Sequence, residues 1–451
     1  MINTIGSYGS IHFALQNTHH ERKNHTDSLI FNTLISIFNS FSISNSLYLI
    51  KKATLNRLLR FAIAITLVLC PAMQVLHANN TPSIINMHYK FPDNGAIETH
   101  LLIFNKLLQD HGISNTIATS TGSTFVLEQA SQQGLACTTF NHQDWGPRAT
   151  DLEPLCIQNA PTIICNGIGH LTTGIALHAT HNNPIILMHH YFFSELLANS
   201  IPAINNIQGI VTVSPLVAQQ LQDLQKKGIV KVPHIKHIAP FWNDQKFLDF
   251  SPHRSKVDFF AQEYGINLQE NTPVITMLAN LYWCKNQALL LKSLQLLQRK
   301  NPLLQVVFAG EGNDRKELEA LAREHKLERI AHFIGRTEKT PELLHHSTIH
   351  VLTSSHEGLG IAYLEAAMMK KPFIAATGTG IEPIIQKGIT GLVFENNNVE
   401  DLTNKLAILL EAPQLCKVMG DNAYTFVRKH YSTEALFKNW LDFFAAINKQ
   451  K

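Results

Sequence analysis

Two glutamates stand eight residues apart in the segment SSHEGLGIAYLEAAMMKKP (354–372). Glu357 belongs to a loop with Gly358 and Gly360, and Glu365 falls on the helix that the loop opens. The free N–H groups and positive dipole end of such a helix favour an anion such as a diphosphate. A carboxylate on a half-apolar helix face needs a partner that offsets its desolvation, and a sugar diol offers two hydroxyl donors. The segment therefore predicts a site for a sugar and a diphosphate; the alternative is a capping Glu357 and a solvent-facing Glu365.

The composition excludes several classes of protein. The 451 residues, 45% of them apolar and 16% charged, suffice for two or three globular domains. A formal net charge of +3 is far from the concentrated basic charge of nucleic-acid binding proteins. The six cysteines form no C-x-x-C pair, and the paired histidines lack the i, i+4 spacing of a helical metal site. We therefore expect no nucleic-acid partner, no disulfide framework and no metal site.

The first eighty residues differ from the rest of the chain. Residues 61–76 are apolar, follow four basic residues and precede a small residue in VLHA (75–78), which is the layout of a signal peptide or a short signal anchor. Its position is unusual, because about fifty residues come before it. The alternative is a hydrophobic segment packed on a membrane or a neighbouring domain. We interpret residues 1–80 as an N-terminal extension that carries a signal-like or anchor-like segment.

From residue 82 onward, short apolar runs alternate with longer stretches of helical period. This alternation is typical of parallel sheets covered by helices on both faces. A polar break at 241–255 separates two such series, so the sequence predicts an α/β fold of two Rossmann-like domains that face each other across a cleft. The expected strands are 84–90, 115–121, 136–140, 162–167, 184–190, 209–214 and 234–240 in the first series, and 274–279, 304–310, 330–335, 348–354, 372–377 and 391–394 in the second.

No dinucleotide or P-loop fingerprint follows a strand, which argues against a nicotinamide dehydrogenase and a P-loop nucleotide hydrolase. Instead, residues 274–394 resemble the glycosyltransferases of family 4 in FAGEGNDRKELEALA (308–322), in the stretch 333–380 and in KGITGLVF (387–394). That family has the two-Rossmann GT-B architecture. The resemblance implies retaining, metal-independent transfer of a hexose-type sugar from a nucleotide-diphosphate sugar to a hydroxyl acceptor, a glycan or lipid-linked saccharide, as in cell-envelope polysaccharide synthesis. It implies no cofactor besides this donor substrate.

The resemblance also assigns roles to the second half. Glu365 matches the glutamate that would hold the ribose, and Glu357 the one that would contact the donor sugar. Lys285 matches the phosphate-binding lysine, whereas the family's arginine position is occupied by Asn280, which removes a bidentate donor. The Glu382-Pro383 order reverses the usual one, so Glu382 receives no role. The further donor-binding positions are Gly358, Gly360, Ile361, Arg336, Gly378 and Gly380.

In the first half the resemblance is looser. Asn94 and Gly95 stand where relatives carry paired glycines against the donor phosphates, although a plain turn explains them equally well. His190 fits the place of a histidine near the transferred sugar, where an imidazole can hydrogen-bond a hydroxyl; the alternative is a histidine packed at a strand end. The implied domains are 82–245 for the acceptor and 246–430 for the donor, with a final helix in 431–451 that packs back on the first domain.

Two other classes of function stay open. One is a GT-B-like sugar-nucleotide epimerase or phosphorylase, and the other is a nucleotide-sugar-binding protein with weakened catalysis, which Asn280 makes conceivable. We expect the cytoplasmic face of a membrane as the location, because sugar nucleotides and reduced thiols belong to the cytoplasm. The signal-like segment 51–78 leaves export and membrane association open.

Overall fold

The structure is a computed structural model, and all residues that it describes belong to the unit Asn80–Lys451. The N-terminal extension, with its apolar segment 61–76, lies outside the described residues. Within the described part of the chain, no helix has both the length and the apolar character that a membrane crossing requires. The described residues are 83–88, 96–120, 123–140, 149–156, 161–167, 170–190 and 198–448.

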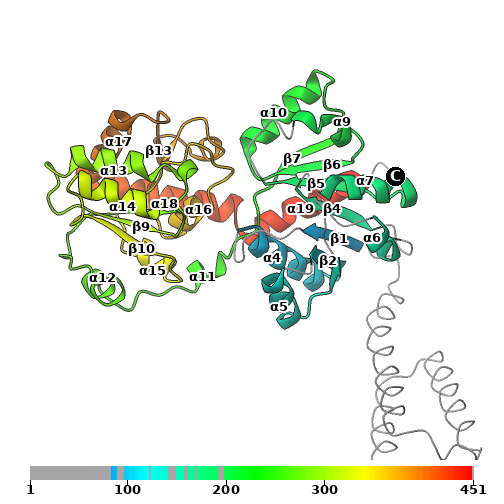
Figure 1. Cartoon of the computed structure of the whole chain (residues 1–451), viewed down its shortest axis with the longest axis horizontal. Coiled ribbons are helices and arrows are strands. Elements are labelled where there is room, and N and C mark those ends of the chain that lie inside the picture. The colour runs from blue at the N-terminus through cyan, green and yellow to red at the C-terminus, as the bar shows by residue number, and fades with distance from the viewer. Residues whose placement is uncertain are drawn as a thin grey trace, which may run out of the picture. The chain divides into compact units, whose positions relative to one another are not determined.

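Seven parallel strands form the first sheet, in the order β3-β2-β1-β4-β5-β6-β7 (Figure 1). The strands are β1 (Ser83–His88), β2 (Ser114–Ser120), β3 (Cys137–Phe140), β4 (Thr162–Asn166), β5 (Ile185–His189), β6 (Gly209–Thr212) and β7 (His234–His237). The central strands are buried, which their apolar sequences require in a sheet covered on both faces. The helices of this half are α4 (Ala96–Asp110), α5 (Thr124–Gln132), α6 (Ala149–Cys156), α7 (Leu171–His181), α9 (Ile201–Ile204) and α10 (Pro215–Lys226).

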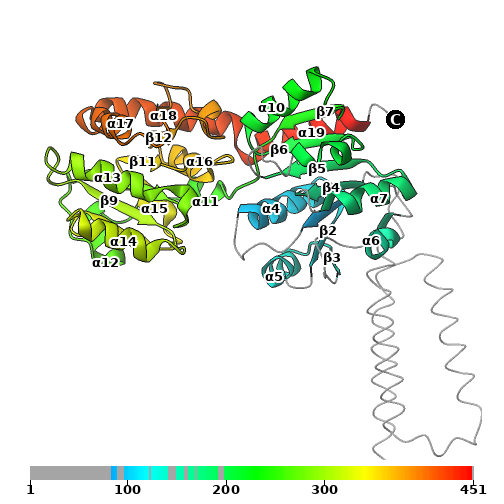
Figure 2. The same cartoon turned by 45° about the horizontal axis from the view of Figure 1, so that its top comes forward.

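Six parallel strands form the second sheet, in the order β10-β9-β8-β11-β12-β13, and helices cover both of its faces (Figure 2). The strands are β8 (Val274–Leu278), β9 (Gln305–Ala309), β10 (Ala331–Gly335), β11 (Ile349–Leu352), β12 (Phe373–Ala376) and β13 (Gly391–Phe394). The helices are α12 (Lys256–Tyr264), η4 (Trp283–Lys285), α13 (Gln287–Leu297), α14 (Arg315–Glu324), α15 (Thr340–His345), α16 (Ile361–Met368), η5 (Glu382–Ile384), α17 (Val399–Glu411) and α18 (Pro413–His430).

The two sheets confirm the predicted α/β fold with two Rossmann-like halves, and every expected strand is present. In both sheets the order reverses beside the first strand, between β1 and β4 and between β8 and β11. Ligands of open parallel sheets bind beyond the carboxyl ends of the strands at such a switch point. The fold therefore directs the search for a site to the residues that follow β8 and β11.

Two segments of chain connect the halves and are hydrogen-bonded to each other. The first is the polar break, which holds the one-turn helix α11 (Gln245–Leu248). The second lies between α18 and the last helix, α19 (Thr433–Asn448). Asp244 accepts hydrogen bonds from the backbone N–H of Thr433 at 3.0 Å and from its hydroxyl at 2.7 Å, and Trp242 Nε1 donates to the carbonyl of Tyr431 at 2.9 Å. The expected break is thus a well-packed connection, because its aromatic side chains are buried.

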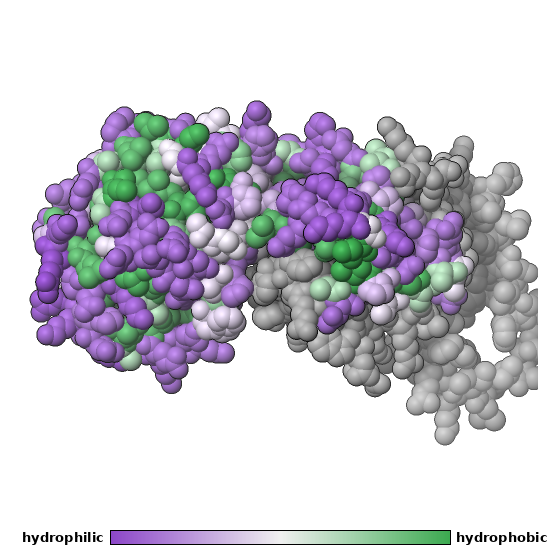
Figure 3. Space-filling view, turned by 90° about the horizontal axis from the view of Figure 1, so that it is seen from above, coloured by the Kyte–Doolittle hydropathy of each residue, from purple (hydrophilic) through white to green (hydrophobic). Residues whose placement is uncertain are grey.

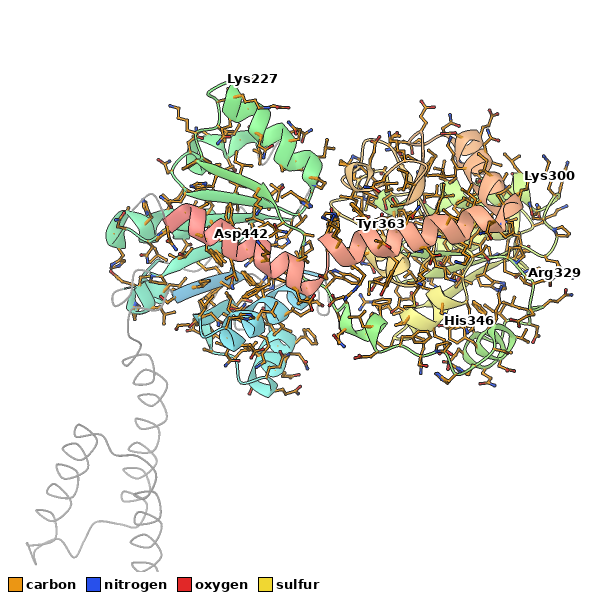
Figure 4. All side chains as sticks on the ribbon, turned by 180° about the vertical axis from the view of Figure 1, so that it is seen from behind. Lys227, Lys300, Arg329, His346, Tyr363 and Asp442 are labelled. Atoms are coloured by element: carbon orange, nitrogen blue, oxygen red, sulfur yellow. The ribbon has the colours of Figure 1, made fainter. Side chains whose placement is uncertain are left out.

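Helix α19 packs on the first half of the molecule (Figure 4, where Asp442 is labelled). Its Trp440 is fully buried, with the ring centroid 4.6 Å from that of Phe104 on α4. A Cβ atom on Gly209 of β6 would approach the ring of Phe443 to 2.8 Å, so the helix lies close against this strand. On the face in Figure 3, the described surface is mostly hydrophilic, and apolar residues are scattered between.

Replacing Trp440 with alanine is expected to lower the free energy of unfolding by about 3–5 kcal/mol, because a fully buried tryptophan leaves a large cavity. The neighbouring Leu441 is 36% exposed, so Leu441→Ala should change the free energy of unfolding by no more than about 0.5 kcal/mol. Urea denaturation followed by circular dichroism measures both. Equal losses in the two variants would contradict the packing described for α19.

Candidate functional site

A cavity of about 250 Å³ lies at the carboxyl ends of β8 and β11, bordered by their last residues, Leu278 and Leu352. Residues of the first half complete its wall, among them Ile97 on α4. Of the residues that the sequence singled out, the structure brings six together around this cavity: His190, Lys285, Glu357, Gly358, Gly360 and Ile361.

An ion pair joins two of these residues. Lys285 ends the short helix η4 after β8, and Glu357 lies in the loop after β11, the neighbouring strand. Lys285 Nζ is 2.6 Å from Glu357 Oε2, which also accepts a hydrogen bond from the Ser354 hydroxyl at 3.1 Å. Both side chains are largely sheltered, with 23% and 13% of their surface exposed. The lysine and the carboxylate thus hold each other in place and can both face a bound molecule.

Close backbone packing fixes the loop that carries Glu357. The N–H of Gly380 donates to the carbonyl of Glu357 at 2.8 Å, and a Cβ on Gly380 would lie 1.7 Å from the carbonyl oxygen of Gly358. Gly360, with φ +75°, precedes α16 in a conformation that other residues avoid, and a Cβ there would lie 2.4 Å from Ile381 Cδ1. These glycines therefore let two loops meet, and the meeting sets where Glu357 stands.

His190 is held as a neutral hydrogen-bonding group. Burial and the neighbouring His100 lower the pKa of His190 well below its usual value. Asn166 donates its amide N–H to the carbonyl of Met87 at 3.0 Å, so its oxygen, 3.2 Å from His190 Nε2, accepts a hydrogen bond from that nitrogen. The other ring nitrogen, Nδ1, is then the hydrogen-bond acceptor of the imidazole. His190 can accept a hydrogen bond from a hydroxyl, but it supplies no positive charge near neutral pH.

His100 is a second neutral imidazole that the sequence reasoning did not single out. Its ring centroid lies 6.0 Å from that of His190, and the backbone N–H of Phe241 donates to its Nδ1 at 2.9 Å. Burial lowers the pKa of His100 to about 3. No motif marks this residue, because its role depends on the packing of the linker segment against α4.

Glu365 lies one helical turn beyond Ile361 on α16 and does not line the cavity. Its Oε1 is 3.5 Å from the ammonium of Lys246 on α11, which also donates to the Thr340 hydroxyl at 3.0 Å. Burial raises the pKa of Glu365, and the attraction of Lys246 works against this rise. The structure thus supplies the partner that this carboxylate needed, in a residue that the sequence reasoning missed.

The other predicted positions lie apart from the cavity. Arg336 is exposed, and so is Asn280, whose carbonyl accepts from Gln287 Nε2 at 2.9 Å. The N–H of Gly378 donates to Glu382 Oε2 at 2.7 Å, and Glu382 also pairs with Lys387 at 2.7 Å. Gly380 acts through the loop contact described above. Asn94 and Gly95 lie outside the described residues.

Comparisons with known proteins find glycosyltransferases. Residues 259–426 match the model of "Glycosyl transferases group 1". An uncharacterized glycosyltransferase of Haemophilus influenzae is 27% identical over 38% of this chain and 48% of its own length. A GDP-mannose-dependent monoacylated alpha-(1-6)-phosphatidylinositol monomannoside mannosyltransferase of Corynebacterium glutamicum is 26% identical over 59% of this chain and 71% of its own length. The match thus spans about half the length of the first of these relatives.

The fold has a counterpart among solved structures. The crystal structure of Anabaena Alr3699/HepE in complex with UDP superposes with a TM-score of 0.69 and 16% identity, over 81% of this chain and all of that chain. At this identity the likeness concerns the fold, which is the GT-B arrangement of two Rossmann-like halves.

Proposed function

We propose, from the match of residues 259–426 to the model of the group 1 glycosyl transferases, that the chain is a retaining, metal-independent glycosyltransferase. It would move a hexose-type sugar from a nucleotide-diphosphate sugar to a hydroxyl of a glycan or lipid-linked saccharide, as in the synthesis of cell-envelope polysaccharides. The observation that carries the proposal is the Lys285–Glu357 pair at the start of α16, on one cavity at the carboxyl ends of β8 and β11.

In this proposal the donor diphosphate binds between Lys285 and the N-terminus of α16. The ammonium and the free N–H groups of the helix both attract negative charge. The diphosphate competes with Glu357 for Lys285, because Lys285 Nζ and Glu357 Oε2 are 2.6 Å apart. Glu357 is then released to accept hydrogen bonds from hydroxyls of the donor sugar. His190 accepts a further hydrogen bond from the sugar through its unprotonated nitrogen.

The reaction breaks the bond between the anomeric carbon and the diphosphate oxygen, and the electron pair leaves with the diphosphate. Lys285 and the N–H groups of α16 stabilise the negative charge that develops on the departing diphosphate oxygen. The acceptor hydroxyl attacks on the face that the diphosphate leaves, and the departing oxygen takes its proton. The configuration of the sugar is retained because bond breaking and bond making occur on one face.

Uridine and guanosine diphosphates are the first nucleotides to test. The Anabaena protein is in complex with UDP, and the Corynebacterium relative is described as GDP-mannose-dependent. That relative acts on a phosphatidylinositol mannoside, which favours a lipid-linked acceptor here as well. We place the reaction at the cytoplasmic face of a membrane, where nucleotide sugars are made and where the basic flank of the apolar segment would lie.

A donor and acceptor screen tests this function. The full-length protein is incubated with UDP-glucose, UDP-N-acetylglucosamine or GDP-mannose, and the release of nucleoside diphosphate is measured with and without membrane lipid extracts and glycans. We expect release that requires an acceptor, together with a new glycosidic bond of the donor's configuration in the product. An altered free sugar nucleotide would indicate an epimerase, and nucleotide binding without release would indicate a binding protein.

Glu357→Gln is expected to lower turnover by about a hundredfold, because an amide holds the sugar's hydroxyls less firmly as charge develops. Nucleoside diphosphate affinity should stay the same or rise, since Lys285 loses the carboxylate that competes with the phosphates. Steady-state kinetics and isothermal calorimetry with UDP and GDP separate the two effects. Unchanged turnover, or a large loss of nucleotide affinity, would contradict the assigned role.

A further inference from the structure

We propose that Lys246 is a positioning residue for the nucleotide: it holds the Glu365 carboxylate in place, so that Glu365 accepts hydrogen bonds from the ribose hydroxyls. The inference rests on the proposed function and adds a residue to the nucleotide-binding part of that site. Lys246 stands on α11, in the segment that connects the two halves, far in sequence from the segment that carries Glu365.

The surroundings of Lys246 fix where its charge lies. Nζ is 3.5 Å from Glu365 Oε1 and donates to the Thr340 hydroxyl at 3.0 Å. It also lies 4.9 Å from the ring centroid of Phe247, whose side chain is buried. The lysine side chain is 34% exposed and that of Glu365 17%, so the pair stands at the edge of the solvent. In the proposal, the ribose hydroxyls approach the part of the Glu365 carboxylate that remains exposed.

Lys246 is also the charged group that acts on Glu365 among the described residues. Among the described elements, α11, α15, α18 and β12 pack most extensively against α16. On α15, Glu342 pairs with Arg254 at 2.6 Å, and His345 lies against Phe250. On α18, Lys417 pairs with Asp421, and the last turn carries Arg428, Lys429 and His430; β12 carries no charged residue. None of these groups shifts the pKa of Glu365.

The direction of the pH effect follows from this balance. Burial raises the pKa of Glu365, and Lys246 lowers it again in part. As the pH falls through this pKa, the carboxyl takes up a proton and loses acceptor capacity, so nucleotide affinity should fall. Without Lys246 the pKa rises further, and the loss of affinity should begin at a higher pH.

Lys246 also ties Glu365 to the connection between the halves. It stands two residues after Asp244, which accepts two hydrogen bonds from Thr433 in the second connecting segment. A ribose held by Glu365 would therefore be positioned relative to both connections. Neither the spacing of the two glutamates nor the sequence of the loop between them predicts this contact between Lys246 and Glu365.

The test compares nucleotide binding by the full-length wild type, Lys246→Met and Lys246→Arg. The exposed Lys300, labelled in Figure 4, gives the matched control Lys300→Met. Calorimetric titrations with UDP and GDP, and with their 2′-deoxy and 3′-deoxy analogues, run from about pH 5 to about pH 8, the range in which a raised carboxyl pKa is visible. Thermal unfolding of each variant reports whether the fold is kept.

We expect Lys246→Met to weaken UDP or GDP binding about tenfold at neutral pH, in line with hydrogen bonds to charged groups. The midpoint of the pH dependence should move upward, and the preference for the ribose over its deoxy analogues should shrink. Lys246→Arg should restore most of the nucleotide affinity and of the preference for the ribose. Lys300→Met should match the wild type. Glu365→Gln should remove the pH dependence of nucleotide affinity.

Three results would overturn the inference, and the first two are distinct from each other. If Lys246→Met weakens binding of UDP and its deoxy analogues equally, with an unchanged pH midpoint, the residue has only a structural role and the proposed function stands. If the wild type binds neither UDP nor GDP nor any other nucleoside diphosphate, the proposed function fails and this inference fails with it. An unfolded Lys246→Met moves the comparison to Lys246→Arg and Glu365→Gln, where an unaltered pH dependence in Glu365→Gln also overturns the inference.

Discussion

Gly380→Ala is expected to reduce turnover by about a hundredfold or more, although Gly380 does not line the cavity. A Cβ atom at this position would lie 1.7 Å from the carbonyl oxygen of Gly358 and 2.7 Å from that of Glu357. Neither contact involves a flexible side chain, so one of the two loops must move by about an ångström. A displacement of that size at a reacting group costs about two orders of magnitude in rate. Steady-state turnover of the proposed transfer, at saturating donor, measures it.

The matched control is Gly388→Ala. Gly388 has φ +77°, and a Cβ atom added there would have no other atom within 4 Å, so alanine meets backbone strain of about 1–2 kcal/mol but no clash. This variant should melt at a lower temperature and keep the turnover of the wild type. Wild-type turnover in Gly380→Ala would show that the contact between the two loops does not set the position of Glu357.

The fold could be read from the sequence because its signals are local. Most strands are short apolar runs, and some helices begin and end at residues that favour these positions. The Ser214 hydroxyl accepts a hydrogen bond from the N–H of Val217 at the start of α10, and Gly228, with φ +73°, follows its end. Gly112, with φ +70°, follows α4 in the same way. Such features depend on a few neighbouring residues, so periodicity and turn chemistry suffice to predict them.

The part of the site that follows β8 and β11 could also be predicted from the sequence, because the loops at the carboxyl ends of neighbouring strands lie side by side. Lys285 and Glu357 are far apart in sequence, yet the strand order places them 2.6 Å apart. Lys246 and His100 could not be found in this way. Their positions depend on the packing of the connecting segment against α16 and α4, and no motif or spacing encodes that packing.

The protonation state of His190 likewise depends on three-dimensional surroundings. Its sequence position suggested a group near the sugar, but only the burial beside His100 and the hydrogen bond to Asn166 make it a neutral acceptor. The distinction matters for mechanism, because the N–H of this neutral imidazole is donated to Asn166 and its free nitrogen can only accept, so His190 cannot stabilise a departing diphosphate. The positive charge must come from another residue of the cavity.

Lys285→Met is therefore expected to lower turnover by about a hundredfold to a thousandfold, the usual effect of removing one group that stabilises developing negative charge. Asn280 occupies the position for which the resemblance implies an arginine, and it does not line the cavity; His190 is neutral. Among the described residues that line the cavity, Lys285 is thus the one basic side chain that can attract the diphosphate. No second side chain there can take over its role, which places the expected loss toward the upper end of the range.

Three measurements separate this role from a structural one. Lys292 on α13 is exposed, so Lys292→Met should retain wild-type turnover and stability. Lys285→Arg keeps the charge and should recover part of the turnover, whereas Lys285→Met should also bind UDP and GDP less tightly. The double variant Lys285→Met, Glu357→Gln should lose less transition-state stabilisation than the two single variants lose together. Each single change already breaks the 2.6 Å ion pair. Turnover of Lys285→Met within about threefold of the wild type would mean that the N–H groups of α16 alone stabilise the leaving diphosphate.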